Sequence, residues 1–86
     1  MTKHEAAQAA LGAHDRLQEA QAREPELMQD GMPFDPDLWL AWHSTDYKPA
    51  YEGWSAAMDA LSVAIGESIG RHPSTFRPLC EELART

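Results

Sequence analysis

The residue types that carry covalent chemistry are scarce in this chain. Its single cysteine, Cys80, is the only candidate thiol nucleophile. It lies near the start of an expected last helix, whose dipole would lower the pKa of the thiol. However, Cys80 shares a helix face with Phe76 and Leu83, and no histidine stands near it in the sequence to act as a base. A cysteine in such a position behaves as a small buried hydrophobic residue, so we expect it to pack in the core.

The histidines and carboxylates form no recognisable metal or acid–base site. His43 and Asp46 are three residues apart on one expected helix face, but two ligands do not make a metal site. Asp35 and Asp37 are too close in sequence to face each other on a helix. The chain also has no glycine-rich phosphate loop, serine elbow or dinucleotide-binding fingerprint. We therefore predict a protein that is not an enzyme and has no metal or cofactor.

The charge of the chain restricts the partners that it can attract. Fourteen acidic and seven basic side chains give a formal net charge of −7, and the acids are dispersed instead of forming a tail. Nucleic acids and anionic membranes bind basic surfaces, so we expect neither as a direct partner. A protein with a basic surface is compatible with this charge. Opposite charges on the two molecules would attract each other.

The sequence also indicates the cellular compartment of the protein. The first residues are polar and charged where a signal peptide needs an apolar run. No apolar stretch approaches the roughly 18 residues of a membrane helix. A single thiol fits a reducing compartment. These features predict a cytoplasmic protein.

Helix signals run through the whole chain, and no run alternates apolar and polar residues as a half-buried strand would. Thr2 and Glu5 match a capping box, which starts the first helix. We predict an all-α fold: one acidic domain over residues 1–86, built as a small bundle of three main helices and a short one. The expected helices span residues 3–23, 36–45, 49–69 and 75–85.

Proline and glycine residues are expected to separate these helices. Pro49 should open the third helix after a break at Tyr47-Lys48. Gly70 should end that helix, whereas Gly66 is expected at a point of close approach between backbones.

The expected inward faces are complementary in size. The first helix brings mostly alanine: Ala6, Ala10, Ala13, Leu17 and Ala20. The third brings large side chains at spacings of three and four: Tyr51, Trp54, Met58, Leu61, Ile65 and Ile69. Small residues facing large ones let two layers interlock. We therefore expect three aromatic residues in the core: Trp42, Tyr51 and Trp54.

Six of the seven aromatic residues lie between residues 34 and 54, and several of them do not fit this core. Trp39 lies at the edge of its helix face, Leu40 points away from it, and Phe34 follows a proline. Apolar residues mixed with acids at a surface mark interaction sites. We therefore predict a protein-binding module, such as an adaptor, accessory subunit or inhibitor. Its predicted partner-binding residues are Phe34, Asp35, Asp37, Trp39, Leu40 and Tyr47.

Two other interpretations are compatible with the sequence. An acidic protein of this size can mimic nucleic acid and inhibit an enzyme or defence complex that handles it, as inhibitors from phages and mobile elements do. Alternatively, the alanine-rich first helix packs against a second copy in a homo-oligomeric structural protein. Small domains without disulfides often gain stability from such association.

Overall fold

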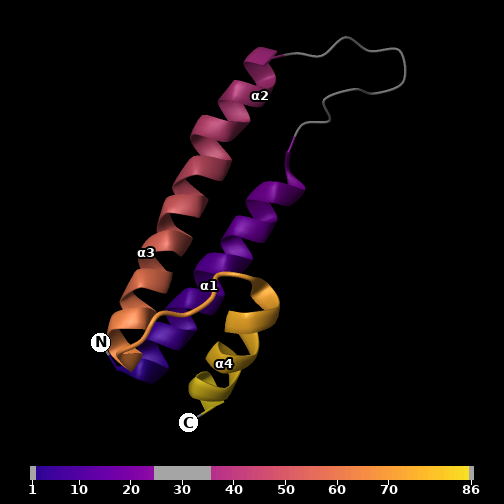
Figure 1. The fold of residues 1–86 in the computed structure, drawn as a ribbon. Coiled ribbons are helices and arrows are strands. Elements are labelled where there is room, and N and C mark those ends of the chain that lie inside the picture. The colour runs from indigo at the N-terminus through magenta and orange to yellow at the C-terminus, as the bar shows by residue number, and fades with distance from the viewer. Residues whose placement is uncertain (1, 25–35, 86) are drawn as a thin grey trace.

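The computed structural model describes residues 2–24 and 36–85, and most of these residues are helical (Figure 1). Residues 66–72 form a loop between two helices. No strand occurs in the described residues, which confirms the predicted all-α class and a helical bundle. The helical elements are α1 (Lys3–Ala22), α2 (Pro36–Trp42), the π-helical turn η1 (His43–Tyr47), α3 (Lys48–Ile65) and α4 (Pro73–Arg85).

Helix α1 begins at the predicted cap. The backbone N–H of Glu5 donates to Thr2 Oγ1 at 3.1 Å, and the Thr2 hydroxyl donates to the Glu5 carboxylate at 3.0 Å. This satisfies one of the amides that a helix start leaves without a partner. The five predicted inward residues of α1 are all buried, together with Ala7 and His14.

Helices α2 and α3 are joined through η1 into one continuous helix of 30 residues, which we call the long helix. The break expected at Tyr47-Lys48 is therefore wrong. Pro49 has no N–H to donate, and in an α-helix its ring would crowd the carbonyl of Thr45. The turn before it widens instead, so that the Lys48 N–H donates to the His43 carbonyl five residues earlier. Such a π turn lets the helix pass a proline without stopping.

The long helix ends four residues before the predicted position, at Ile65. Gly66 adopts a left-handed conformation (φ 79°), and its N–H donates to the Ser62 carbonyl at 2.9 Å. The roles expected for the two glycines are thus reversed. A Cβ on Gly66 would meet nothing within 4 Å, whereas one on Gly70 would lie 3.0 Å from Thr75 Cγ2. Gly66 is the helix stop, and Gly70 allows the chain to pass close to the start of α4.

Helix α4 covers only one end of the hairpin that α1 and the long helix form (Figure 1). Its contacts reach the N-terminal half of α1: His4 Nδ1 donates to the Leu83 carbonyl at 3.3 Å, and Arg77 reaches His14 and Asp15. Three helices therefore pack together at this end. At the other end, the described elements that face α1 are α2 and η1.

The core follows the predicted pairing of small and large residues, with one exception. Trp42 and Trp54 are each 8% exposed, as expected, and Met58 and Leu61 are fully buried. Tyr51 was expected inside but is 44% exposed, so that prediction is wrong. Two packed helices bury only a narrow stripe along each other. Tyr51 lies at the edge of that stripe, on a part of the hairpin that α4 does not cover.

Candidate binding face

Four ring side chains follow one side of the long helix: Trp39, His43, Tyr47 and Tyr51. We call them the ring row. Their centroids are separated by 5.1, 5.4 and 5.9 Å in turn, and the planes of successive rings differ by 23°, 31° and 20°. Residues four apart lie on one side of a helix, and a wider π turn reduces their drift around the axis. The row is therefore a consequence of the unbroken helix.

A hollow of about 410 Å³ lies between the end of α1 and the upper part of the long helix. We call it the aromatic hollow. It is lined by Gln21, Glu24, Trp39, Trp42, His43 and Tyr47. Hydrogen bonds fix its two indoles: Trp42 Nε1 donates to the Ala20 carbonyl at 2.8 Å, and Trp39 Nε1 donates to Glu24 Oε1 at 3.3 Å. The hollow thus combines aromatic rings with a carboxylate at its edge.

The structure brings together two of the six predicted partner-binding residues. Trp39 and Tyr47, both partly buried, line the aromatic hollow. Leu40 is 53% exposed and Asp37 is exposed, but neither lines it. Phe34 and Asp35 lie outside the described residues. The sequence pattern did not single out Gln21, Glu24 and His43 for this site, because only the fold carries the end of α1 to α2.

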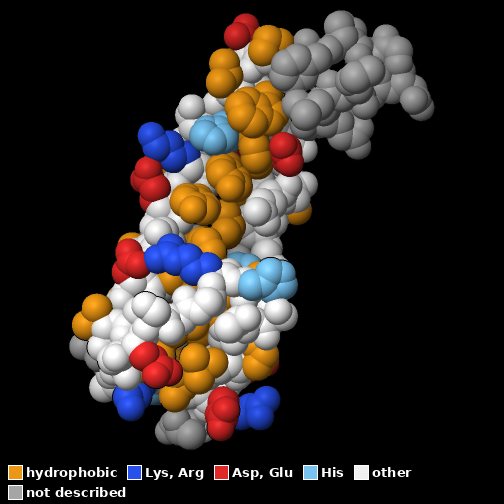
Figure 2. All heavy atoms as spheres, in the orientation of Figure 1, with side chains coloured by type: hydrophobic (Ala, Val, Ile, Leu, Met, Phe, Trp, Pro, Cys, Tyr) orange, Lys and Arg blue, Asp and Glu red, His pale blue; other side chains and the backbone are white. Residues whose placement is uncertain are grey.

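The surface view is consistent with this arrangement. Figure 2 shows hydrophobic side chains gathered in a column over α2 and the upper part of α3, with charged side chains along its edges. The two-helix end therefore presents apolar surface to solvent. None of the helices in the described part of the chain is long and apolar enough to cross a membrane.

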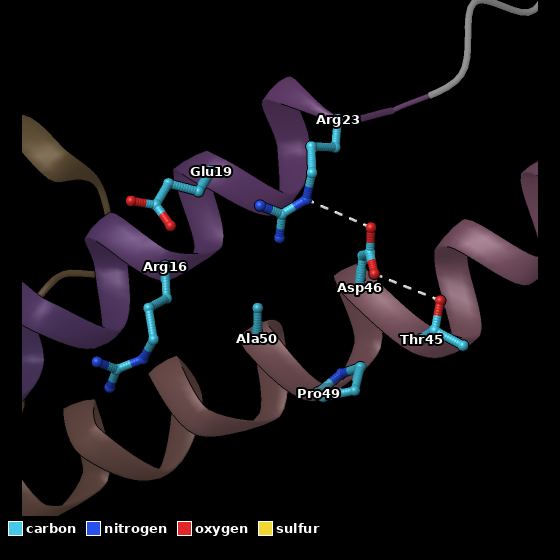
Figure 3. A pocket seen from close by; sticks show the side chains of 7 residues that line it. All are labelled: Arg16, Glu19, Arg23, Thr45, Asp46, Pro49 and Ala50. Atoms are coloured by element: carbon cyan, nitrogen blue, oxygen red, sulfur yellow. Dashed lines mark hydrogen bonds and ion pairs between the residues drawn. The ribbon is translucent and has the colours of Figure 1, made fainter.

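A second hollow, of about 350 Å³, lies between α1 and the long helix on another side of α1. Figure 3 shows its lining residues: Arg16, Glu19, Arg23, Thr45, Asp46, Pro49 and Ala50. Arg23 Nε lies 3.4 Å from Asp46 Oδ2. Because carboxylates stand beside both arginines, this hollow has no strong preference for an ion of either sign. Asp46 lines this second hollow, whereas His43 lines the aromatic hollow, so the two side chains do not share a site.

At the three-helix end, Cys80 has a packing role and not a reactive one. Cys80 is fully buried, and burial raises the pKa of its thiol more than the nearby Arg77 lowers it. The thiol therefore stays protonated, and Cys80 packs in the core as predicted. Among the described residues, no group of three or more His, Cys, Asp or Glu side chains is placed to hold a metal ion.

His14 is a buried polar residue that sequence reasoning missed. Its ring contacts Phe76 edge-on at 4.9 Å between centroids, and its Nδ1 accepts from Arg77 Nη1 at 2.7 Å. Burial, and then the charge of Arg77, lower the pKa of His14 against a smaller opposite effect of Asp15. His14 continues the alanine stripe of α1 at a spacing of four from Ala10, which was the available signal. It holds α4 against α1 in its neutral form.

Comparisons of the chain with protein-family models, curated proteins and solved structures found no match.

Proposed function

We propose that this chain is a non-enzymatic protein-binding module, in which the end of the hairpin that α4 does not cover presents its aromatic and acidic face to a protein partner. It would serve as an adaptor, an accessory subunit or an inhibitor. The observation that carries the proposal is the aromatic hollow beside the partly exposed ring row, at the end of the hairpin that α4 does not cover.

The uneven thickness of the fold supports this proposal. At the three-helix end Phe76 and Cys80 of α4 complete the core, and both are fully buried. At the other end no helix among the described residues takes that place, and Tyr51 and Leu40 are 44% and 53% exposed. Apolar surface that a partner buries favours binding by roughly 25 cal/mol per Å², before the entropic and desolvation costs of association are subtracted. A third element from a partner would find the largest gain here.

The residue types at this end also favour a protein partner. Tryptophan and tyrosine are enriched among the few residues that dominate binding energy, because they bury large areas with little loss of side-chain freedom. Trp39 and Tyr47 are partly buried and held by neighbouring rings. They would reach a partner already in position. Asp37 and Leu40, exposed on α2, extend the face beyond the hollow.

The proposal is tested by capture with a matched control. A tagged chain is used as bait in the cells from which it derives, beside the double variant Trp39→Ala/Leu40→Ala and the variant Val63→Ala. Val63 is 82% exposed near the other end of the long helix, so its loss removes apolar surface away from the proposed face. Recovered proteins are quantified by mass spectrometry, and each one is then titrated as a purified protein.

We expect a partner that the unchanged chain and Val63→Ala bind equally, and that the double variant binds at least tenfold more weakly. Circular dichroism should show that both variants remain helical. Equal affinity of the double variant for every purified partner would refute the proposed face.

A further inference from the structure

We propose that the aromatic hollow receives an arginine side chain of the protein partner, whose guanidinium lies against the rings and pairs with Glu24. This inference rests on the proposed function and specifies the chemistry of the partner. It follows from the charge of the hollow, from its geometry and from a comparable contact elsewhere in the fold.

The aromatic rings and the carboxylate that line the hollow favour a cation over an anion. The faces of aromatic rings are the negative parts of their quadrupoles, and tryptophan binds cations most strongly among them. Glu24 adds a carboxylate. Among the described residues that line the hollow, none is a lysine or an arginine. Arg16 and Arg23 line the second hollow instead, and the whole chain carries a formal charge of −7.

The geometry favours a flat cation. The Trp42 ring lies beside those of Trp39 and Tyr47, with centroids 6.0 Å and 5.4 Å away, and the His43 ring stacks on Trp39 at 5.1 Å. This spacing leaves no room for a group between the rings, so a ligand must lie across their open faces. A guanidinium is planar, weakly hydrated and able to stack on a ring, whereas an ammonium is a compact and strongly hydrated charge.

Glu24 is placed to complete such a contact. Its carboxylate lies beside the Trp39 indole, whose Nε1 donates to Oε1 at 3.3 Å. A carboxylate has several acceptor positions, so it can accept from an indole and from a guanidinium together. Arginine is therefore preferred over lysine both by the rings and by the carboxylate.

The fold already contains one arginine held in this way. The guanidinium of Arg71 lies 5.9 Å from the centroid of the Trp54 ring, and it donates to the Asp59 carboxylate and the Ser55 hydroxyl. A tryptophan face and a nearby carboxylate thus hold an arginine at the three-helix end. The aromatic hollow offers the same two groups, and there the arginine would come from another molecule.

The inference is tested with short peptides and the indole N–H signals of the three tryptophans, measured by NMR on the ¹⁵N-labelled chain. The probe is an alanine-based peptide with two arginines four residues apart, a spacing that suits the ring row. In the first control peptide citrulline replaces arginine, which keeps the planar group and removes the charge. In the second, lysine replaces arginine.

We expect the arginine peptide to shift the Trp39 and Trp42 signals and to leave the Trp54 signal in place. The citrulline peptide should bind at least tenfold more weakly, and the lysine peptide should fall between the two. In the chain, Trp39→Ala and Glu24→Gln should each weaken binding by tenfold or more. The matched control Glu67→Gln, which removes an exposed carboxylate far from the hollow, should change affinity less than twofold.

Several results would overturn the inference. The Trp39 and Trp42 signals could remain unshifted, or Glu24→Gln and Glu67→Gln could weaken binding equally, as for unspecific attraction between charges. Signals that shift when the chain is concentrated without peptide would assign the hollow to a second copy instead. If the double variant loses the captured partner but the unchanged chain does not bind the arginine peptide, only this inference is refuted. If the unchanged chain binds the arginine peptide but the double variant still binds every captured partner, only the proposed function is refuted.

Discussion

Trp42 and Trp54 offer a direct test of the packing between α1 and the long helix. Both indoles are 8% exposed, but their N–H groups are in opposite situations. Trp42 Nε1 donates to the Ala20 carbonyl at 2.8 Å, whereas Trp54 Nε1 is buried without an acceptor among the described residues. Substitution by phenylalanine removes the N–H and part of the ring at either position. The two substitutions should therefore have opposite effects on hydrogen bonding: Trp42→Phe loses a hydrogen bond, and Trp54→Phe removes a buried donor that has no acceptor.

The magnitude follows from that difference. Trp42→Phe loses a neutral hydrogen bond worth about 1 kcal/mol, and the Ala20 carbonyl still accepts from the Arg23 N–H. Trp54→Phe removes a buried donor whose missing acceptor costs about 1–3 kcal/mol. If the loss of ring area is similar, Trp42→Phe should be the less stable variant by about 2–4 kcal/mol. At a urea dependence of about 1 kcal/mol per molar, the unfolding midpoints should differ by about 2 M or more.

The assay is urea unfolding followed by circular dichroism, with all variants in the same fixed concentration of trimethylamine N-oxide so that the less stable one begins folded. Benzothienylalanine at each position provides a closer control, because sulfur replaces the N–H in a ring of nearly the same size. Equal midpoints for the two positions, or a lower midpoint for the Trp54 variants, would refute the assignment of these two indoles.

Three further predictions address other parts of the fold. Burial and Arg77 lower the pKa of His14 below its usual 6.5, so as the pH falls the unfolded chain binds a proton before the folded chain does. The stability present above pH 6.5 should therefore decrease as the pH falls below 6.5. His14→Gln should flatten this pH dependence of the urea midpoint, and an unchanged pH dependence would contradict the prediction. Gly66→Ala should destabilise the protein by about 1 kcal/mol because Gly66 has a positive φ. Gly53→Ala should stabilise it by up to about 1 kcal/mol, because Gly53 lies in the interior of α3 and an added Cβ would meet nothing within 4 Å. Thermal unfolding compares the two variants, and stability changes of the same sign would contradict the assigned roles. Cys80 is fully buried with a raised pKa, so iodoacetamide at neutral pH should label it only in urea, and rapid labelling of the folded chain would show an accessible thiol.

The local signals in the sequence were sufficient for the helices and for most of the core. Thr2 and Glu5 placed the start of α1, and the alanine stripe of α1 is buried as its spacing indicates. Trp42 and Trp54 were correctly placed inside, because helical periodicity records which face of a helix is covered. Each of these features depends on residues within a few turns of each other.

The features that were missed depend on more than one element. A proline read alone favours a helix start, and only packing against α1 on both sides of Pro49 makes a continuous helix with a π turn preferable. Tyr51 carries the same local signal as Trp54, but its exposure depends on how far α4 extends. Glu24 and His43 both line the aromatic hollow because tertiary packing brings their helices together, and no spacing in the sequence predicts this arrangement.

The π turn also sets the rotational phase between the two halves of the long helix. At roughly 100° per residue, the twelve residues from Trp42 to Trp54 would place them roughly 120° apart around an α-helix. A π turn absorbs one additional residue, which reduces this angle to roughly 20° and lets both tryptophans face α1. Converting the π turn to regular α-helix without shortening the segment would therefore turn one tryptophan out of the interface, whereas deleting one residue from His43–Tyr47 would keep both tryptophans on the same side. The turn acts as a one-residue insertion that keeps two hydrophobic faces in phase, so the twist of this segment matters more than its length.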